Sequence, residues 1–156
     1  MENNTTYKIL VSAIIVKDGK ILISQRDHKD SFRPGEWTVP GGKVENYGNV
    51  EEIENIVEKT LIKEVREEVG VEIKETAHLI ANYTFKHKEG HIMLALVFMC
   101  EYLSGTAQPL EDTAEVRWIT ANELSEYNFP ETVHKALAKT FALIPYRPRT
   151  KAKPAS

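Results

Sequence analysis

Three glutamates, Glu64, Glu67 and Glu68, lie within about one turn of a predicted helix. On a helical wheel of about 100° per residue, Glu68 falls inside the apolar arc of this helix and Glu64 falls at its edge. The arc is formed by Val57, Leu61, Ile62, Val65 and Val69. Neighbouring like charges repel one another, and a partly buried carboxylate is costly unless a cation meets it. Clustered carboxylate oxygens suit Mg²⁺ or Mn²⁺, so this pattern favours a metal site.

The simpler interpretation is that these glutamates only keep the helix soluble, with Lys63 and Arg66 as partners. A second feature, the stretch Pro40-Gly41-Gly42-Lys43, argues against that interpretation. Alone, this stretch predicts a tight turn. Because it lies between a strand and the carboxylate helix, its bare backbone can approach a metal or a phosphate closely.

The elements that must position these residues follow from the apolar pattern and the turn signals along the chain. The predicted strands are 8–16, 21–24, 37–39, 71–85, 91–102 and 115–119, and Pro40-Gly41-Gly42 is expected to end the third of them. The predicted helices run from about Glu51 to Val69, stopped by Gly70, then briefly from 122, and from 130 to 144. This order predicts an α/β fold of the α+β type, a mixed β-sheet sandwiched between helices.

Composition sets the class of protein. The 156 residues are 42% hydrophobic and 28% charged, which suits one globular domain, expected over 1–144. The stretch 145–156 holds four basic residues and no acid, so it is expected to be a basic flexible tail. The rest is more acidic than the overall net charge of −3, which argues against nucleic-acid binding.

Other classes of site and location are excluded by pattern. The single Cys100 makes no internal disulfide and no cysteine-rich zinc site. No apolar run approaches the ~20 residues of a membrane span, and the start MENNTTYK is unlike a signal peptide. We therefore expect a cytoplasmic protein without a membrane partner, and the sequence leaves a homodimer open.

The run from Gly41 to Val71 resembles the Nudix box, in which a glycine and a glutamate precede R-E-U-x-E-E-x-G-U, with U apolar. Residues 63–71, KEVREEVGV, match the second half at every specified position except the first. The preceding Trp37-x-x-Pro40 pattern, Arg26, and the stretch from Leu124 to Pro130 also resemble MutT-like members. The resemblance covers roughly residues 8–144.

The resemblance implies a Mg²⁺- or Mn²⁺-dependent hydrolase that cleaves a phosphoanhydride of a nucleoside diphosphate linked to another group. The implied metal ligands are the Gly41 carbonyl, Glu64, Glu67, Glu68 and, on the late strand, Glu115. Glu64 or Glu67 would assist the attacking water, and Arg26 and Lys43 would bind the substrate. For Glu115 a plain surface role, and for Arg26 a surface salt bridge, are the alternatives. The nucleobase is expected among the loops near Phe129 and the first strands.

Two departures from the family pattern qualify this expectation. Lys63 stands where the family has arginine, and about seven extra residues are inserted around 46–55. An acid of the insertion is a candidate partner for Lys63, which lacks the two-pronged guanidinium. Signatures of NADH and ADP-ribose hydrolases are absent, which favours nucleoside triphosphates as substrates. The alternatives are a hydrolase of ADP-ribose or another nucleotide derivative, a nucleotide-binding module without turnover, and an interaction domain that uses the basic tail.

Overall fold

A computed structural model describes residues 4–46, 48 and 50–144, so the predicted tail lies outside the described residues. The strands are β1 (Tyr7–Lys17), β2 (Lys20–Arg26), β3 (Trp37–Thr38), β4 (Gly41–Lys43), β5 (Glu72–Lys86), β6 (Ile92–Ser104) and β7 (Thr113–Ile119). The helices are α1 (Ile56–Val69), the 3₁₀ helix η1 (Ala121–Glu126) and α2 (Glu131–Leu143). No helix in the described part of the chain is long and apolar enough to cross a membrane.

All seven strands join one sheet of mixed direction. Its central path is β3-β2-β1-β6-β5, in which β1 and β6 run parallel while β1 with β2 and β5 with β6 run antiparallel. β4 adds to β1, and β7 adds to β2. The predicted mixed sheet is therefore confirmed.

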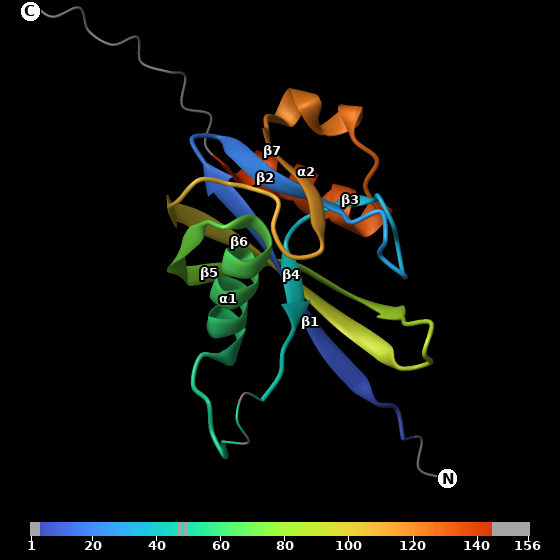
Figure 1. Ribbon diagram of the computed structural model, residues 1–156. Helices are drawn as coiled ribbons and strands as arrows, with labels where there is room; N and C mark the ends of the chain where they lie inside the picture. Colours follow the sequence, from blue (N-terminus) through green and yellow to red (C-terminus); the bar gives the residue numbers. More distant parts are fainter. Residues whose placement is uncertain (1–3, 47, 49, 145–156) are drawn as a thin grey trace, which may run out of the picture.

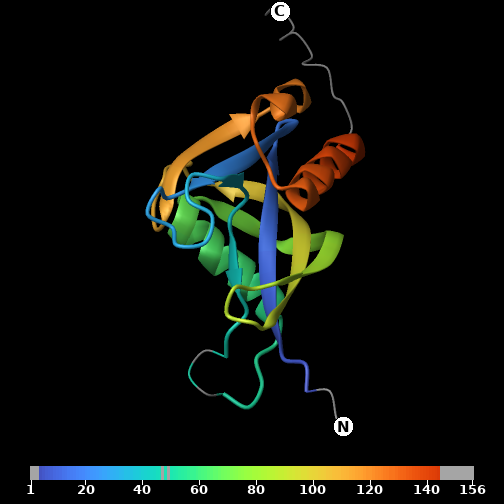
Figure 2. The same cartoon turned by 90° about the vertical axis from the view of Figure 1, so that its right-hand side faces the viewer.

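Helices cover both faces of this sheet (Figures 1 and 2). Alternate side chains of β1 pack into two separate hydrophobic cores, one on each face of the sheet, as expected of a central strand with both faces buried. Val11 and Ala13 belong to the core under α1, which buries Leu61 and Val65 of the helix. Ile14 belongs to the core under α2, whose buried residues are Val133, Ala136, Leu137 and Thr140. The predicted sandwich is confirmed, with β1 at its centre.

The predicted third strand does end before Pro40, but the sequence analysis missed the strand that begins at Gly41. This strand, β4, pairs antiparallel with β1 through Ser12–Gly41 and Val11–Gly42. The flanking bonds Ala13 N–H to the Pro40 carbonyl, at 2.8 Å, and Val44 N–H to the Ile9 carbonyl, at 2.9 Å, extend this pairing. Glycine has low strand propensity, so its pattern concealed a strand that tertiary pairing stabilises.

The prediction that α1 begins near Glu51 was also wrong, because the helix begins at Ile56. Asn55 has a φ of 55°, a left-handed conformation that a right-handed helix cannot include. Upstream, the Asn46 side chain bonds both polar groups of the Val50 backbone and so closes a loop. The predicted stop is confirmed, since Gly70 has a φ of 71° and donates to the Arg66 carbonyl.

Candidate active site

A cavity of about 440 Å³ is lined by residues of β1, β2, β5 and the N-terminal end of α2, together with Gly41 of β4 and Glu68 of α1. Its wall combines charged groups with aromatic rings. The wall includes Arg26, Asp30, Phe32, Gly41, Glu68, Tyr83, Phe85 and Asp112. Of the predicted site residues, Arg26, Gly41 and Glu68 therefore lie on one cavity wall.

The two glycines of β4 let the helix and the sheet approach closely. A Cβ on Gly41 would stand 2.3 Å from the Val11 carbonyl oxygen, which is backbone and cannot yield. A Cβ on Gly42 would stand 2.3 Å from Cδ of Glu64. Only glycine fits at position 41, because the β1 backbone blocks any side chain there, whereas at position 42 the Glu64 side chain would have to move aside. The glycine strand therefore lies against Glu64 of α1, while the predicted approach of its backbone to a metal or a phosphate stays a prediction.

Glu68 is the most deeply placed carboxylate of the helix. It accepts a hydrogen bond of 2.9 Å from the backbone N–H of Gly41. Burial raises the pKa of Glu68 to about 8; the Gly41 bond and the Arg26 charge oppose this rise, while Glu64 and Asp112 add to it. The chain therefore holds a carboxylate that is hard to ionise unless a further cation is supplied.

Glu64 and Glu67 lie beside Glu68 on α1, and both form ion pairs with Lys63. The Lys63 ammonium lies 3.1 Å from a Glu67 oxygen and 3.5 Å from a Glu64 oxygen. Burial raises the pKa of Glu64; Lys63 offsets this in part, while Glu67 and Glu111 raise the pKa further. Lys63, which replaces the family's arginine, is thus placed to orient both carboxylates.

Arg26 ends β2 and faces the cavity. Its guanidinium forms a 3.4 Å ion pair with Asp30, which also accepts the backbone N–H groups of Phe32 and Arg33. The Arg26 Nε is buried and has no hydrogen-bond partner in the described part of the chain. A buried donor without a partner is costly, so this nitrogen is suited to an anionic group in the cavity.

Four predicted site residues are not on the cavity wall: Glu64 and Glu67, which lie beside Glu68 on α1, and Lys43 and Glu115, which lie on strands. Lys43 is exposed, opposite Leu10 of β1, and is not on the cavity wall. Glu115 lies opposite Gln25 of β2, where it forms an ion pair with Arg117, and it too is absent from the wall. The structure therefore brings neither Lys43 nor Glu115 to the cavity.

Asp112 is the carboxylate that sequence reasoning missed. The segment before it folds onto the end of α1, where Leu110 N–H donates to the Glu68 carbonyl at 3.0 Å and Glu111 N–H donates to the Glu67 carbonyl at 3.3 Å. This contact places Asp112 on the cavity wall, close enough to raise the pKa of Glu68. In the sequence Asp112 is one acid in a polar loop, and no pattern there distinguishes it. In the structure it has a positive φ of 50°.

Comparison with known proteins agrees with this geometry. The family described as "NUDIX domain" matches residues 11–139. A CTP pyrophosphohydrolase of Escherichia coli is 32% identical over 121 residues, which cover 76% of this chain and 79% of the relative. An ADP-ribose pyrophosphatase of Methanocaldococcus jannaschii is 28% identical over 135 residues, which cover 85% and 72%.

Solved structures show the same fold. The solution structure of the Escherichia coli ORF135 protein matches with a TM-score of 0.69 at 27% identity, over 100% of this chain and 99% of that one. The MutT NUDIX hydrolase of Burkholderia pseudomallei matches with a TM-score of 0.67 at 24% identity, over 86% and 98%. Together with the carboxylates that α1 carries to the glycine strand, these matches show that the chain belongs to the Nudix hydrolase family and is a pyrophosphohydrolase.

Proposed function

We propose that this enzyme hydrolyses nucleoside triphosphates to a nucleoside monophosphate and pyrophosphate, with Mg²⁺ or Mn²⁺ as cofactor. One observation carries the proposal. Glu68, whose carboxylate accepts a hydrogen bond from Gly41 N–H, and Arg26, whose Nε has no hydrogen-bond partner among the described residues, both line one cavity. The Glu68 carboxylate is suited to bind a metal cation, and the Arg26 guanidinium is suited to bind a phosphate. A polyphosphate with a bound metal ion would contact both groups.

The donor set fits a hard divalent cation. In residues 4–46, 48 and 50–144, no lysine or arginine forms an ion pair with Glu68, although burial makes its charge costly. We assign Glu64, Glu67, Glu68 and the Gly41 carbonyl as ligands, all oxygen donors of the type that Mg²⁺ and Mn²⁺ prefer. When bound, the metal would neutralise phosphate charge and make water more acidic.

Proton transfer falls to one of the two glutamates beside Lys63. Glu64 or Glu67 would accept a proton from water as the water oxygen forms a bond to the α-phosphorus of the triphosphate. The bond between that phosphorus and the bridging oxygen then breaks, and pyrophosphate leaves with the bond's electron pair. Arg26 would stabilise the developing negative charge by donating from its guanidinium. Lys43, which is exposed on β4, is assigned no role in this step.

Two residues, Glu115 and Asp112, are candidates for a fourth carboxylate of the site. Glu115, the residue that the family resemblance indicates, would first have to leave Arg117. Asp112 already lies on the cavity wall near Glu68. We therefore propose Asp112 as an additional acidic residue of the site.

The nucleobase has an aromatic wall available. Phe32 and Phe85 stack with ring centroids 6.3 Å apart, and Tyr83 lies 6.1 Å from Phe85. All three line the cavity, whereas Phe129, near which the base was expected, packs against the core under α2. Aromatic faces bind a flat base by stacking, so we place the base against Phe32 and Phe85.

A second candidate substrate, ADP-ribose, is favoured by the 28% identical archaeal ADP-ribose pyrophosphatase. The two substrates give different products. A nucleoside triphosphate yields pyrophosphate, whereas ADP-ribose yields AMP and ribose phosphate without pyrophosphate. The binding module without turnover would yield no product from either.

The test is a panel of ribo- and deoxyribonucleoside triphosphates and ADP-ribose, incubated with the full chain in Mg²⁺, in Mn²⁺ and in EDTA. Products are separated by anion exchange. The proposal predicts metal-dependent monophosphate and pyrophosphate in equal amounts. Release of orthophosphate and a diphosphate, or of product from ADP-ribose alone, would overturn it, as would binding without any product.

A further inference from the structure

The turn between β5 and β6 brings two histidines and a glutamate together. The backbone N–H of His87 donates to the backbone carbonyl of His91 at 2.9 Å, and the backbone N–H of Gly90 donates to the backbone carbonyl of His87 at 2.8 Å. Gly90 has a φ of 96°, which glycine adopts readily and other residues rarely do. These bonds set His87 and His91 opposite each other, with Glu89 between them in the sequence.

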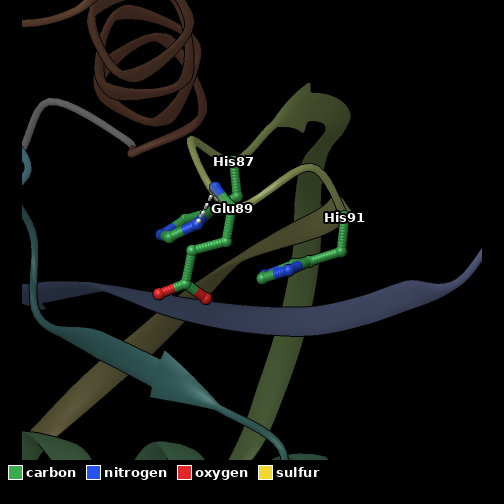
Figure 3. Close-up of side chains that lie close together, drawn as sticks. All are labelled: His87, Glu89 and His91. Atoms are coloured by element: carbon green, nitrogen blue, oxygen red, sulfur yellow. Dashed lines mark hydrogen bonds between the residues drawn. The ribbon is translucent and has the colours of Figure 1, made fainter.

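The side chains converge on one point. Figure 3 shows His87, Glu89 and His91 leaving the turn toward a common centre, and one ligand atom from each lies within 4.8 Å of the others. The two imidazole rings are parallel, with centroids 4.8 Å apart and an interplanar angle of 10°. Ligands of a tetrahedral Zn²⁺ stand about 3.4 Å apart, since each lies about 2.1 Å from the metal. A small rotation of the exposed Glu89 side chain and of the two half-buried imidazole rings would close that difference.

His91 supplies an independent indication that a ligand belongs here. Its Nε2 is buried and has no hydrogen-bond partner in the described part of the chain. A buried polar atom without a partner is costly, so a ligand that meets this nitrogen would be stabilising.

We propose that His87, Glu89 and His91 form a second metal site, which binds one Zn²⁺ with water as the remaining ligand. Two imidazole nitrogens and one carboxylate oxygen are a donor set typical of zinc with an open position. They differ from the oxygen donors proposed for Mg²⁺ around Glu68, so the two sites would select different metals. The long 3.3 Å bond from Glu89 N–H to His87 Nδ1 is given up if His87 binds through Nε2.

The proposed zinc site is linked to the cavity. The His87 ring stacks on Phe32 with centroids 5.4 Å apart, and Phe32 lies on the cavity wall. Lys88 next to it donates to the Ser31 carbonyl at 3.2 Å. A bound Zn²⁺ would hold the His87 ring in place and thereby support Phe32 at the proposed base-binding wall.

Isothermal titration of the full chain with ZnCl₂ tests the site, in excess Mg²⁺ so that the carboxylates around Glu68 are occupied. We expect one Zn²⁺ per chain in the wild type and at least tenfold weaker binding in His91→Ala and in His87→Ala. His78→Ala is the matched control, because His78 is an exposed histidine of β5 outside the cluster, and it should bind as the wild type does. Circular dichroism verifies that each variant is folded.

Glu68→Gln separates the two metal sites. It should leave the zinc stoichiometry and affinity in excess Mg²⁺ unchanged, whereas binding at the catalytic carboxylates would be lost. Adding Co²⁺ in place of Zn²⁺ should give the visible absorption of a tetrahedral ion, and His91→Ala should abolish it. Wild-type zinc affinity in both His87→Ala and His91→Ala would overturn the proposal, as would the absence of zinc binding in the wild type.

Discussion

The backbone N–H of Gly41 donates a 2.9 Å hydrogen bond to the carboxylate of Glu68, although the two residues are 27 positions apart in the chain. This bond joins β4 to α1 and aligns the Gly41 backbone with the deepest carboxylate of the helix. The same contact makes Glu68 sensitive to pH, to substitution of the glycines, and to the cations around it. These three dependences can be measured separately.

The first prediction concerns stability and pH without metal. Because burial raises the pKa of Glu68 from 4.5 to about 8, the folded state binds a proton more tightly than the unfolded state does. The stabilisation is full below about pH 4.5 and is lost as the pH rises through about 8. We expect Glu68 to account for a loss on the order of 1 to 3 kcal/mol across this window.

Urea unfolding in EDTA, for wild type and Glu68→Gln, measures this contribution. The variant stays neutral, so its free energy of unfolding should fall less with rising pH than that of the wild type. Saturating Mg²⁺ should also flatten the wild-type profile, because a bound cation stabilises the ionised carboxylate. Parallel pH profiles in EDTA would show that Glu68 is not the group responsible.

The second prediction separates the two glycines. Gly41→Ala places a methyl group against the Val11 backbone, so it should lower the free energy of unfolding by about 2 kcal/mol or more. Gly42→Ala meets the Glu64 side chain, which can rotate away, so it should fold nearly as well as the wild type but lose most turnover. Melting temperature and kcat of both variants provide the check. Full activity in Gly42→Ala would mean that the position of Glu64 does not matter.

The third prediction concerns Lys63, whose ammonium contacts Glu67 and Glu64. Lys63→Ala should lower kcat several-fold because the two carboxylates lose a group that orients them. The change in stability should be small, below about 1 kcal/mol, since exposed ion pairs contribute little. Lys63→Arg should keep or raise the activity, because a guanidinium can bond two oxygens at once. Equal turnover in wild type and Lys63→Ala would assign Lys63 to the solvated surface.

The fourth prediction compares two acids near the cavity. Asp112→Asn should lower turnover at least tenfold, because Asp112 lies on the cavity wall beside Glu68. Glu115→Gln should have a smaller effect, because its partner is Arg117. Steady-state kinetics at several Mg²⁺ concentrations distinguishes a change in metal affinity from a change in kcat. The reverse order of effects would restore Glu115 as the additional acid.

Local patterns predicted the parts of the site that lie within one element. The positions of Leu61, Val65 and Glu68 on the helical wheel were enough to expect a carboxylate at the buried face, and Gly70 ended the helix as expected. β4 was missed because its glycines have no side chain whose pattern could reveal a strand. Its existence depends on pairing with β1, which is distant in sequence.

The rest of the site depends on contacts between distant segments. Asp112 reaches the cavity only because the preceding residues bond to the end of α1, and nothing in a polar loop signals that contact. Glu115 follows it by three residues, yet strand pairing places it opposite Gln25 and beside Arg117. Which acid faces the cavity is therefore a property of strand register, which the sequence pattern alone left undetermined.

Pyrophosphate release by wild type and Glu68→Gln, with a nucleoside triphosphate in Mg²⁺, tests the central claim most directly. Glu58→Gln serves as the control, because Glu58 lies in the first turn of the same helix and is absent from the cavity wall. The account predicts Mg²⁺-dependent pyrophosphate from wild type and Glu58→Gln, and less than about a tenth of that rate from a folded Glu68→Gln, a loss of more than ~1.4 kcal/mol in transition-state stabilisation. Pyrophosphate release by Glu68→Gln at the wild-type rate, or by wild type equally well in EDTA, would contradict it.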